Sequence, residues 1–256
     1  MLQFCANLSL LFTEVPLSDR FAAAKQAGFS AVEIQFPYSL PAKQIQSILE
    51  EQQLKLVLFN VAADDLMQGG EGLASVPKKR DAFKYAIEQA ASYADYLQPH
   101  AINVLAGRCF DVKKTPFYLD TFQENLTFAT EAFASIGVKT VFEAINTHDM
   151  PHCLIHSGMQ LLDILQQLNQ ATLAMQYDVY HAHRMAEDFS LFIQQHIEKI
   201  GHIQFADSPG RGQPGTGEID FVHLFSILDA SIYTGWLGAE YKPKELTENS
   251  LTWLPK

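Results

Sequence analysis

The feature that most constrains the fold is a regular alternation of short β-rich runs with longer amphipathic runs along the whole chain. Alternation of this kind predicts a parallel sheet with helices packed outside it. The expected strands cover residues 4–8, 31–35, 55–60, 101–105, 139–143, 173–178, 202–205 and 236–240. The expected helices cover residues 17–27, 42–52, 79–97, 117–135, 159–168, 188–197 and 221–230, with the eighth short or replaced by the tail.

Eight β-then-α units in 256 residues favour a closed (β/α)8 TIM barrel that forms one domain over residues 1–256. Length alone would also allow two small domains, but no linker or low-complexity segment interrupts the alternation. The doubly wound nucleotide-binding folds are disfavoured, because no GxGxxG follows the first strand and no Walker motif is present.

The net charge of −11 makes a nucleic-acid partner improbable, because such proteins usually carry a basic patch. Lys and Arg are scattered, apart from the triplet at residues 78–80. The chain has no uninterrupted apolar run of about 18 residues, so no membrane span is expected. Three cysteines without paired spacing, and an N-terminal stretch without a basic region, predict a reduced, cytoplasmic protein without disulfides or a signal peptide.

Four polar residues end consecutive strands in the second half of the chain, namely Glu143, Asp178, Gln204 and Glu240. In a (β/α)8 barrel the active site lies at the carboxyl ends of the strands, so these side chains should face one space. Three carboxylates there repel one another unless a cation lies between them. Oxygen ligands suit Mg²⁺ or Mn²⁺. The alternative is that each acid caps a helix or pairs with a basic residue.

Further polar residues follow these strand ends. His181 lies three residues past Asp178 and is expected to enter the barrel mouth from a loop. Asp149 could accept a hydrogen bond from a substrate hydroxyl, and Arg211 could neutralise a substrate carboxylate through paired donors. Lys242 lies two residues beyond Glu240, so an extended chain would point both side chains to the same face. These four are the candidate substrate-binding residues.

The ordered set of motifs resembles the hydroxypyruvate isomerase family, within the xylose-isomerase-like barrel superfamily. The resemblance runs almost from end to end and rests on FCANLSLLFTEVP, AAAKQAGFSAVEIQFPY, LVLFN, VFEAIN, QYDVYH, HIQFADSPGRGQPGTGEID and GWLGAEYKP. Histidine is usual at the seventh-strand position in the related sugar epimerases, and Gln204 here leans toward the hydroxypyruvate branch. The loop at residues 61–77 departs from the family after Glu71 and after Pro77.

The resemblance implies that Glu143 and Glu240 form the catalytic acid/base pair, and that Glu143, Asp178, Gln204 and Glu240 hold a divalent metal. The implied reaction interconverts hydroxypyruvate and 2-hydroxy-3-oxopropanoate (tartronate semialdehyde) through an enediolate. The substrate is then a small anionic hydroxy-carbonyl compound. His181 and Arg211 match substrate-binding positions of the wider superfamily.

Other functions remain open at this level. The first is a 2-oxo-tetronate isomerase or ketose 3-epimerase of the same superfamily. A metal-dependent nuclease on this barrel is disfavoured by the acidic charge and by the lack of the required histidine set. A non-catalytic small-ligand binding protein is disfavoured by the presence of both glutamates. The sequence leaves the oligomeric state open, a homo-oligomer included.

Overall fold

The expected strands pair in chain order in the computed structural model, which describes residues 2–255. All neighbours are parallel, and β8 closes the barrel on β1. The strands are β1 (Gln3–Asn7), β2 (Ala31–Ile34), β3 (Lys55–Asn60), β4 (Ala101–Asn103), β5 (Lys139–Glu143), β6 (Leu173–Asp178), β7 (Ile200–Phe205) and β8 (Trp236–Ala239). This confirms the predicted (β/α)8 barrel.

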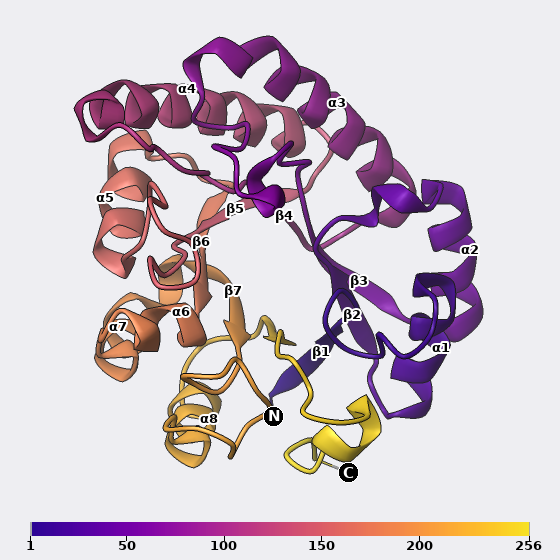
Figure 1. Cartoon of the computed structure of the whole chain (residues 1–256). Coiled ribbons are helices and arrows are strands. Elements are labelled where there is room, and N and C mark those ends of the chain that lie inside the picture. The colour runs from indigo at the N-terminus through magenta and orange to yellow at the C-terminus, as the bar shows by residue number, and fades with distance from the viewer. Residues whose placement is uncertain (1, 256) are drawn as a thin grey trace.

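The helices form a ring outside the strands (Figure 1). They are α1 (Leu17–Gln26), α2 (Ala42–Gln52), α3 (Arg80–Leu97), α4 (Thr115–Ala134), α5 (Gly158–Leu168), α6 (Val179–Arg184), α7 (Phe189–His196) and α8 (Phe221–Asp229). No α-helix follows β8 within residues 2–255; a 3₁₀ turn, η6 (Thr247–Ser250), occupies the tail instead. The sequence had left two alternatives for this last helix, a short helix or its replacement by the tail, and the structure has the second.

The main apolar core lies between the strands and the helices, because alternate strand residues face outward. Phe205 of β7 contacts Phe221 and Phe225 of α8 and Trp253 of the tail, with ring centroids 5.1–5.8 Å apart. A second, smaller cluster includes Ala31, Ala101 and Val141. Each stands two residues before a polar inward residue of its strand. Apolar side chains therefore fill one end of the barrel interior and leave the carboxyl ends for polar groups.

Helix α6 is the one α-helix in residues 2–255 that the sequence analysis did not predict. It is only six residues long and starts directly after Asp178. The Asp178 carboxylate accepts hydrogen bonds from the backbone N–H groups of Tyr180 (2.8 Å) and His181 (3.4 Å) and so caps the helix. His181 consequently lies on a helix, and not on the loop that the sequence suggested.

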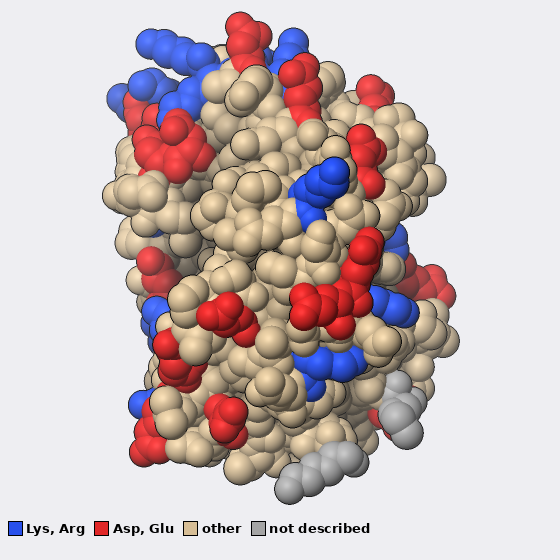
Figure 2. Space-filling view, turned by 90° about the vertical axis from the view of Figure 1, so that its right-hand side faces the viewer, with Lys and Arg blue, Asp and Glu red and all other residues tan. Residues whose placement is uncertain are grey.

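The surface charges, the cysteines and the helix lengths can be compared with what the composition suggested. On the face in Figure 2, acidic and basic side chains are interspersed. All three cysteines are buried and unpaired. No helix within residues 2–255 is both long and apolar enough to cross a membrane.

Candidate active site

A cavity of about 230 Å³ lies at the carboxyl ends of the strands. Its polar lining includes six of the candidate site residues, namely Glu143, Asp149, His181, Gln204, Arg211 and Glu240. The apolar part of its lining includes Leu66, Met67, Leu105 and Met150. A wider hollow of about 840 Å³ at the amino ends of β1 and β8 is lined mainly by apolar side chains. The smaller cavity, which gathers several carboxylates, is therefore the candidate active site.

Three buried carboxylates gather here from three different strands. Glu143 ends β5, Asp178 ends β6, and Glu240 directly follows β8, with exposed fractions of 7%, 4% and 4%. Burial, followed by repulsion from Glu240 and Asp178, raises the pKa of Glu143 to about 8. Burial also raises the pKa of Glu240, to about 7, although Arg211 opposes the shift. Both side chains can therefore exchange protons near neutral pH.

Arg211 is the cation that the structure places among these acids. One guanidinium nitrogen lies 2.5 Å from Glu240 Oε2 and 3.8 Å from Asp178 Oδ2. The guanidinium carbon lies 5.2 Å from the ring centroid of Tyr180, within cation–π range. Burial lowers the pKa of Arg211, but attraction to Glu240 and Asp178 outweighs it, so the pKa is raised. Arg211 therefore stays charged and offsets part of the acidic repulsion.

One side chain, that of Asp207, makes several of the hydrogen bonds that hold the loop carrying Arg211, residues 207–220. The Asp207 carboxylate accepts hydrogen bonds from the backbone N–H groups of Thr216 (2.8 Å), Gly217 (2.7 Å) and Ile219 (3.1 Å). A Cβ atom at Gly217 would lie only 2.1 Å from the Ser208 carbonyl oxygen, so glycine is required there. This network fixes a loop without regular structure and thereby fixes the position of Arg211.

Neutral amides from the first half of the barrel hold the two glutamates. Asn103 of β4 donates to Glu143 Oε1 over 2.6 Å. Asn7 of β1 and Gln35, which follows β2, donate to Glu240 Oε1 over 2.9 and 2.8 Å. Sequence reasoning missed these three amides because it considered the ends of the last four strands alone. The same signal, a polar residue ending an apolar strand, would have found them.

His181 and Asp149 form the side of the cavity near α6. The Nδ1 atom of His181 lies 2.7 Å from the Asn146 amide nitrogen, and its Nε2 atom lies 3.5 Å from Asp178 Oδ2. Burial, helped by Arg211, lowers the pKa of His181 well below its usual value, so its imidazole is neutral. Asp149 accepts a 2.5 Å hydrogen bond from the Tyr180 hydroxyl. Both residues line the cavity, and their substrate-binding role stays a prediction.

Lys242 is the candidate that the structure does not bring to the cavity. Its side chain is exposed and is not part of the cavity lining. The prediction assumed that the strand continues beyond Glu240, but β8 ends at Ala239. Beyond that point, the Lys242 backbone N–H donates to the Arg211 carbonyl oxygen over 2.7 Å. Lys242 thus supports the Arg211 loop through its backbone, and its ammonium group faces solvent.

The donor set fits a hard divalent cation. Glu143, Asp178 and His181 each offer a ligand atom, and these atoms all lie within 4.8 Å of one another. Gln204 is 1% exposed and adds an amide, and the Gln176 Oε1 atom in the same cavity lining is buried without a hydrogen-bond partner among the described residues. The repulsion that raises the pKa values of Glu143 and Glu240 would be relieved by a bound cation. Carboxylate and amide oxygens are ligands that Mg²⁺ and Mn²⁺ accept.

Comparisons with known proteins agree on the family. The family model described as xylose isomerase-like TIM barrel matches residues 21–256. Hydroxypyruvate isomerase of Escherichia coli (strain K12) is 36% identical to the chain, with 99% of this chain and 98% of the relative covered. A 2-oxo-tetronate isomerase of Cupriavidus necator is 37% identical with the same coverage of each chain.

Solved structures extend the similarity to the backbone. A crystal structure described as AP endonuclease, family 2, from Brucella melitensis superimposes with a TM-score of 0.95 at 34% identity, covering 99% of this chain and 98% of that one. An L-ribulose 3-epimerase structure gives a TM-score of 0.80 at 20% identity, covering 99% and 86%. The second comparison shows a shared fold only.

Proposed function

The chain belongs to the hydroxypyruvate isomerase family of xylose isomerase-like TIM barrels, and we propose from this that it interconverts hydroxypyruvate and 2-hydroxy-3-oxopropanoate. The observation that carries the proposal is the pair Glu143 and Glu240, two buried carboxyl groups that line one cavity together with Gln204, His181 and Arg211. A general acid or base must lie within reach of the proton that it transfers, and one cavity brings both carboxyl groups to the same small substrate.

We propose that Glu143, Asp178, Gln204 and Glu240 hold a divalent cation, Mg²⁺ or Mn²⁺. Such an ion, when bound, supplies polarisation of the substrate carbonyl and hydroxyl oxygens and so acidifies the neighbouring C–H bond. The chain's own contribution is to orient the ligand side chains. The amides of Asn7 and Gln35 do so for Glu240, and Asn103 does so for Glu143.

The reaction needs two proton transfers between carbon and a carboxyl group. One glutamate removes a proton from C3 of hydroxypyruvate, and the electron pair of that bond becomes part of an enediolate. The other glutamate delivers a proton to C2, while the hydroxyl proton moves from the C3 oxygen to the C2 oxygen. Each positioned proton transfer is typically worth about 10²–10⁴ in rate.

Substrate recognition falls to the other polar groups of the cavity. Arg211 would pair with the substrate carboxylate, and the neutral His181 imidazole and Asp149 would bind hydroxyl or carbonyl oxygens. Lys242 is left out, because its ammonium group faces solvent. A cavity of about 230 Å³ suits a compact acid of three or four carbons.

A second candidate substrate is a four-carbon 2-oxo acid, because the relative named 2-oxo-tetronate isomerase is as similar to the chain as the hydroxypyruvate isomerase. The mechanism would be the same, since both reactions exchange a carbonyl and a hydroxyl between adjacent carbons. A nuclease role has less support. The described metal-ligand groups at this cavity contain one histidine, and the surface in Figure 2 mixes both signs of charge.

The test is to incubate metal-stripped protein with hydroxypyruvate in D₂O, with and without Mg²⁺ or Mn²⁺, and to follow product and deuterium uptake by NMR. Glu143→Gln and Glu240→Gln serve as variants. We expect product and exchange from the native protein with metal, and neither from the variants. Turnover of four-carbon acids alone would change the substrate and keep the mechanism. No turnover or exchange with any tested acid or ketose would refute the isomerase proposal.

A further inference from the structure

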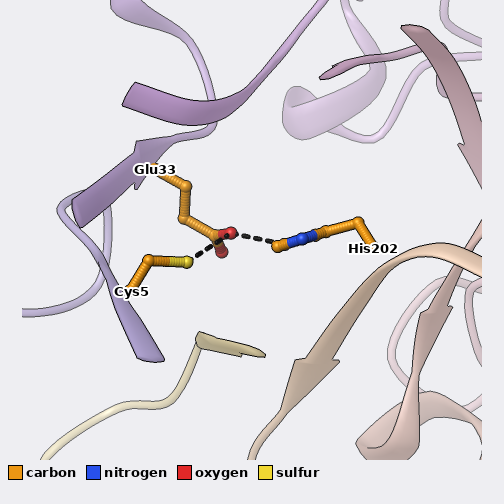
Figure 3. Close-up of side chains that lie close together, drawn as sticks. All are labelled: Cys5, Glu33 and His202. Carbon is orange, nitrogen blue, oxygen red and sulfur yellow. Dashed lines mark hydrogen bonds and ion pairs between the residues drawn. The ribbon is translucent and has the colours of Figure 1, made fainter. Parts of the chain in front are cut away.

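A second polar cluster lies inside the barrel, directly beneath the carboxylates of the cavity. Cys5 of β1, Glu33 of β2 and His202 of β7 are all completely buried and point toward one another (Figure 3). The His202 Nε2 atom lies 2.7 Å from Glu33 Oε2, and the Cys5 sulfur lies 3.5 Å from the same oxygen. The proposed function uses none of these three residues.

The Glu33 carboxylate is the centre of this cluster. Besides His202 and Cys5 on one oxygen, its Oε1 atom accepts hydrogen bonds from Asn7 Nδ2 (2.9 Å) and Gln204 Nε2 (2.7 Å). Burial alone would raise the pKa of Glu33, but attraction to His202 and these hydrogen bonds outweigh burial and lower it. Each Glu33 oxygen therefore meets two nitrogen or sulfur donor groups, so in this arrangement the carboxylate only accepts hydrogen bonds.

An acceptor-only group fixes the orientation of each amide that it contacts. Gln204 must turn its NH₂ group toward Glu33, so its carbonyl oxygen faces away. That oxygen accepts a 2.6 Å hydrogen bond from Gln176 Nε2, whose own oxygen borders the cavity without a hydrogen-bond partner among the described residues. The hydrogen bonds that join Glu33, Gln204 and Gln176 therefore all run in the same direction, with each NH₂ group donating toward Glu33. This order turns amide oxygen atoms, and not NH₂ groups, toward the cavity.

A second set of hydrogen bonds connects Glu33, through Asn7, to the catalytic candidate Glu240. Asn7 Nδ2 donates both to Glu33 Oε1 and to Glu240 Oε1, each over 2.9 Å. The Asn7 oxygen in turn accepts the backbone N–H of Ser9 over 3.0 Å. With its amide held at both ends, Asn7 fixes the distance between the buried Glu33 and the reactive Glu240.

We infer that Glu33 is a positioning residue, which orients the amide of the ligand Gln204 and, through Asn7, the carboxylate of Glu240. This inference rests on the proposed function, because it assigns a purpose to Gln204 and Glu240 there. Groups behind the ligands of a metal site commonly set the geometry of those ligands, and their loss typically costs about 10–100-fold in metal affinity or activity.

A rival reading treats the cluster as a metal site of its own. Cys5, Glu33 and His202 offer three ligand atoms within 4.8 Å of one another. Both oxygens of Glu33, however, already accept two contacts each from named donors. These donors satisfy both oxygens of the Glu33 carboxylate without an ion, and the buried His202 Nδ1 atom is the member of the cluster without a hydrogen-bond partner among the described residues. Metal stoichiometry separates the two readings.

The test compares Glu33→Gln with Cys5→Ala as a matched control from the same cluster. Glutamine at position 33 has one acceptor end, so either Gln204 and Asn7 or His202 and Cys5 lose their acceptor. We expect the Mn²⁺ affinity, measured by calorimetry, and kcat at saturating Mn²⁺ to fall about 10–100-fold. Cys5→Ala should lower the melting temperature without changing Mn²⁺ affinity or stoichiometry, because Cys5 contacts no proposed ligand.

A second variant keeps the test independent of whether Glu33→Gln folds. Glu33→Asp keeps the buried charge but is too short to reach His202 and Gln204 together. It should also lose affinity, and it replaces Glu33→Gln if that variant does not fold.

The results that would overturn the inference are distinct from those that would overturn the function. Native protein that isomerises its substrate while Glu33→Gln and Glu33→Asp keep native Mn²⁺ affinity and kcat would refute a positioning role alone. Two Mn²⁺ ions per chain, with one lost in Cys5→Ala, would favour the second metal site. Native protein that binds no Mn²⁺ and turns over none of the tested acids would refute the proposed function, and the inference with it.

Discussion

Raising the pH should destabilise the metal-stripped protein, because Glu143 and Glu240 must then ionise inside the barrel. Burial, with repulsion from Glu240 and Asp178, raises the pKa of Glu143 from 4.5 to about 8. A carboxyl group with a higher pKa in the folded chain than in the unfolded chain holds its proton more tightly when folded. Its contribution to stability is therefore complete below about pH 4.5 and is lost as the pH rises to about 8.

The magnitude follows from the width of this window. Each pH unit inside it removes roughly 1.4 kcal/mol per titrating group, so the step from about pH 5.5 to about pH 8 should remove roughly 3.4 kcal/mol through Glu143. Arg211 lies against Glu240 and favours its ionised form, so Glu240 ionises first. Repulsion from the ionised Glu240 then makes ionisation of Glu143 the more costly step. The loss of stability belongs to the pair as a whole, so the two pKa shifts do not add.

Urea denaturation with a chelator present, at several pH values between about 5.5 and 8, measures this loss as a fall in the free energy of unfolding. The control is Glu143→Gln, which cannot titrate and should show a much shallower dependence. Adding Mn²⁺ near pH 8 should restore stability in the native protein, because a ligand that binds the folded state stabilises it by mass action. Equal pH dependence in the native protein and in Glu143→Gln would refute the reasoning.

Three further changes have defined outcomes. Asp178→Asn keeps a helix-capping side chain but removes the charge, so Mn²⁺ affinity in calorimetry should fall by more than about tenfold; unchanged affinity would remove Asp178 from the ligand set. Phe205→Ala should lower the free energy of unfolding by about 3–5 kcal/mol in urea, through loss of its contacts with Trp253 and α8; a loss under about 1 kcal/mol would contradict this packing. Gly107 has a φ of 85°, and a Cβ atom there would lie only 2.4 Å from the Glu71 carbonyl oxygen. Gly107→Ala should therefore displace the loop at residues 61–77 and raise KM without changing metal affinity. A native KM would show that this loop does not shape the cavity.

The barrel could be predicted from sequence because its signals are local. Each strand is a short apolar run bounded by turn residues, and each helix has its own amphipathic pattern. The convergence of Glu143, Asp178 and Glu240 followed from one rule, that parallel strands of a barrel share their carboxyl edge. In the structure these three residues are buried, and Arg211 contacts both Asp178 and Glu240. Their catalytic and metal-binding roles stay predictions.

What the sequence could not give depends on contacts between distant segments. Helix α6 is too short to produce a periodic pattern, and its start depends on a cap from Asp178. The place of Arg211 depends on the Asp207 network within an irregular loop. Lys242 turns outward because the strand ends one residue before Glu240, which side-chain alternation cannot reveal. The role inferred for Glu33 needs distances across four strands.

The cavity divides its lining between two kinds of segment, and this division separates chemistry from selectivity. Glu143, Glu240 and the amides that hold them sit on or directly beside the strands, whereas Leu66, Met67 and Met150 of the apolar lining lie outside the strands, in connecting segments. These apolar side chains can therefore be exchanged without replacing a residue that holds the two glutamates. Evolution, or a protein engineer, could lengthen or shorten the accepted carbon chain by changing Met67 and Met150 and leave the proton-transfer apparatus as it is.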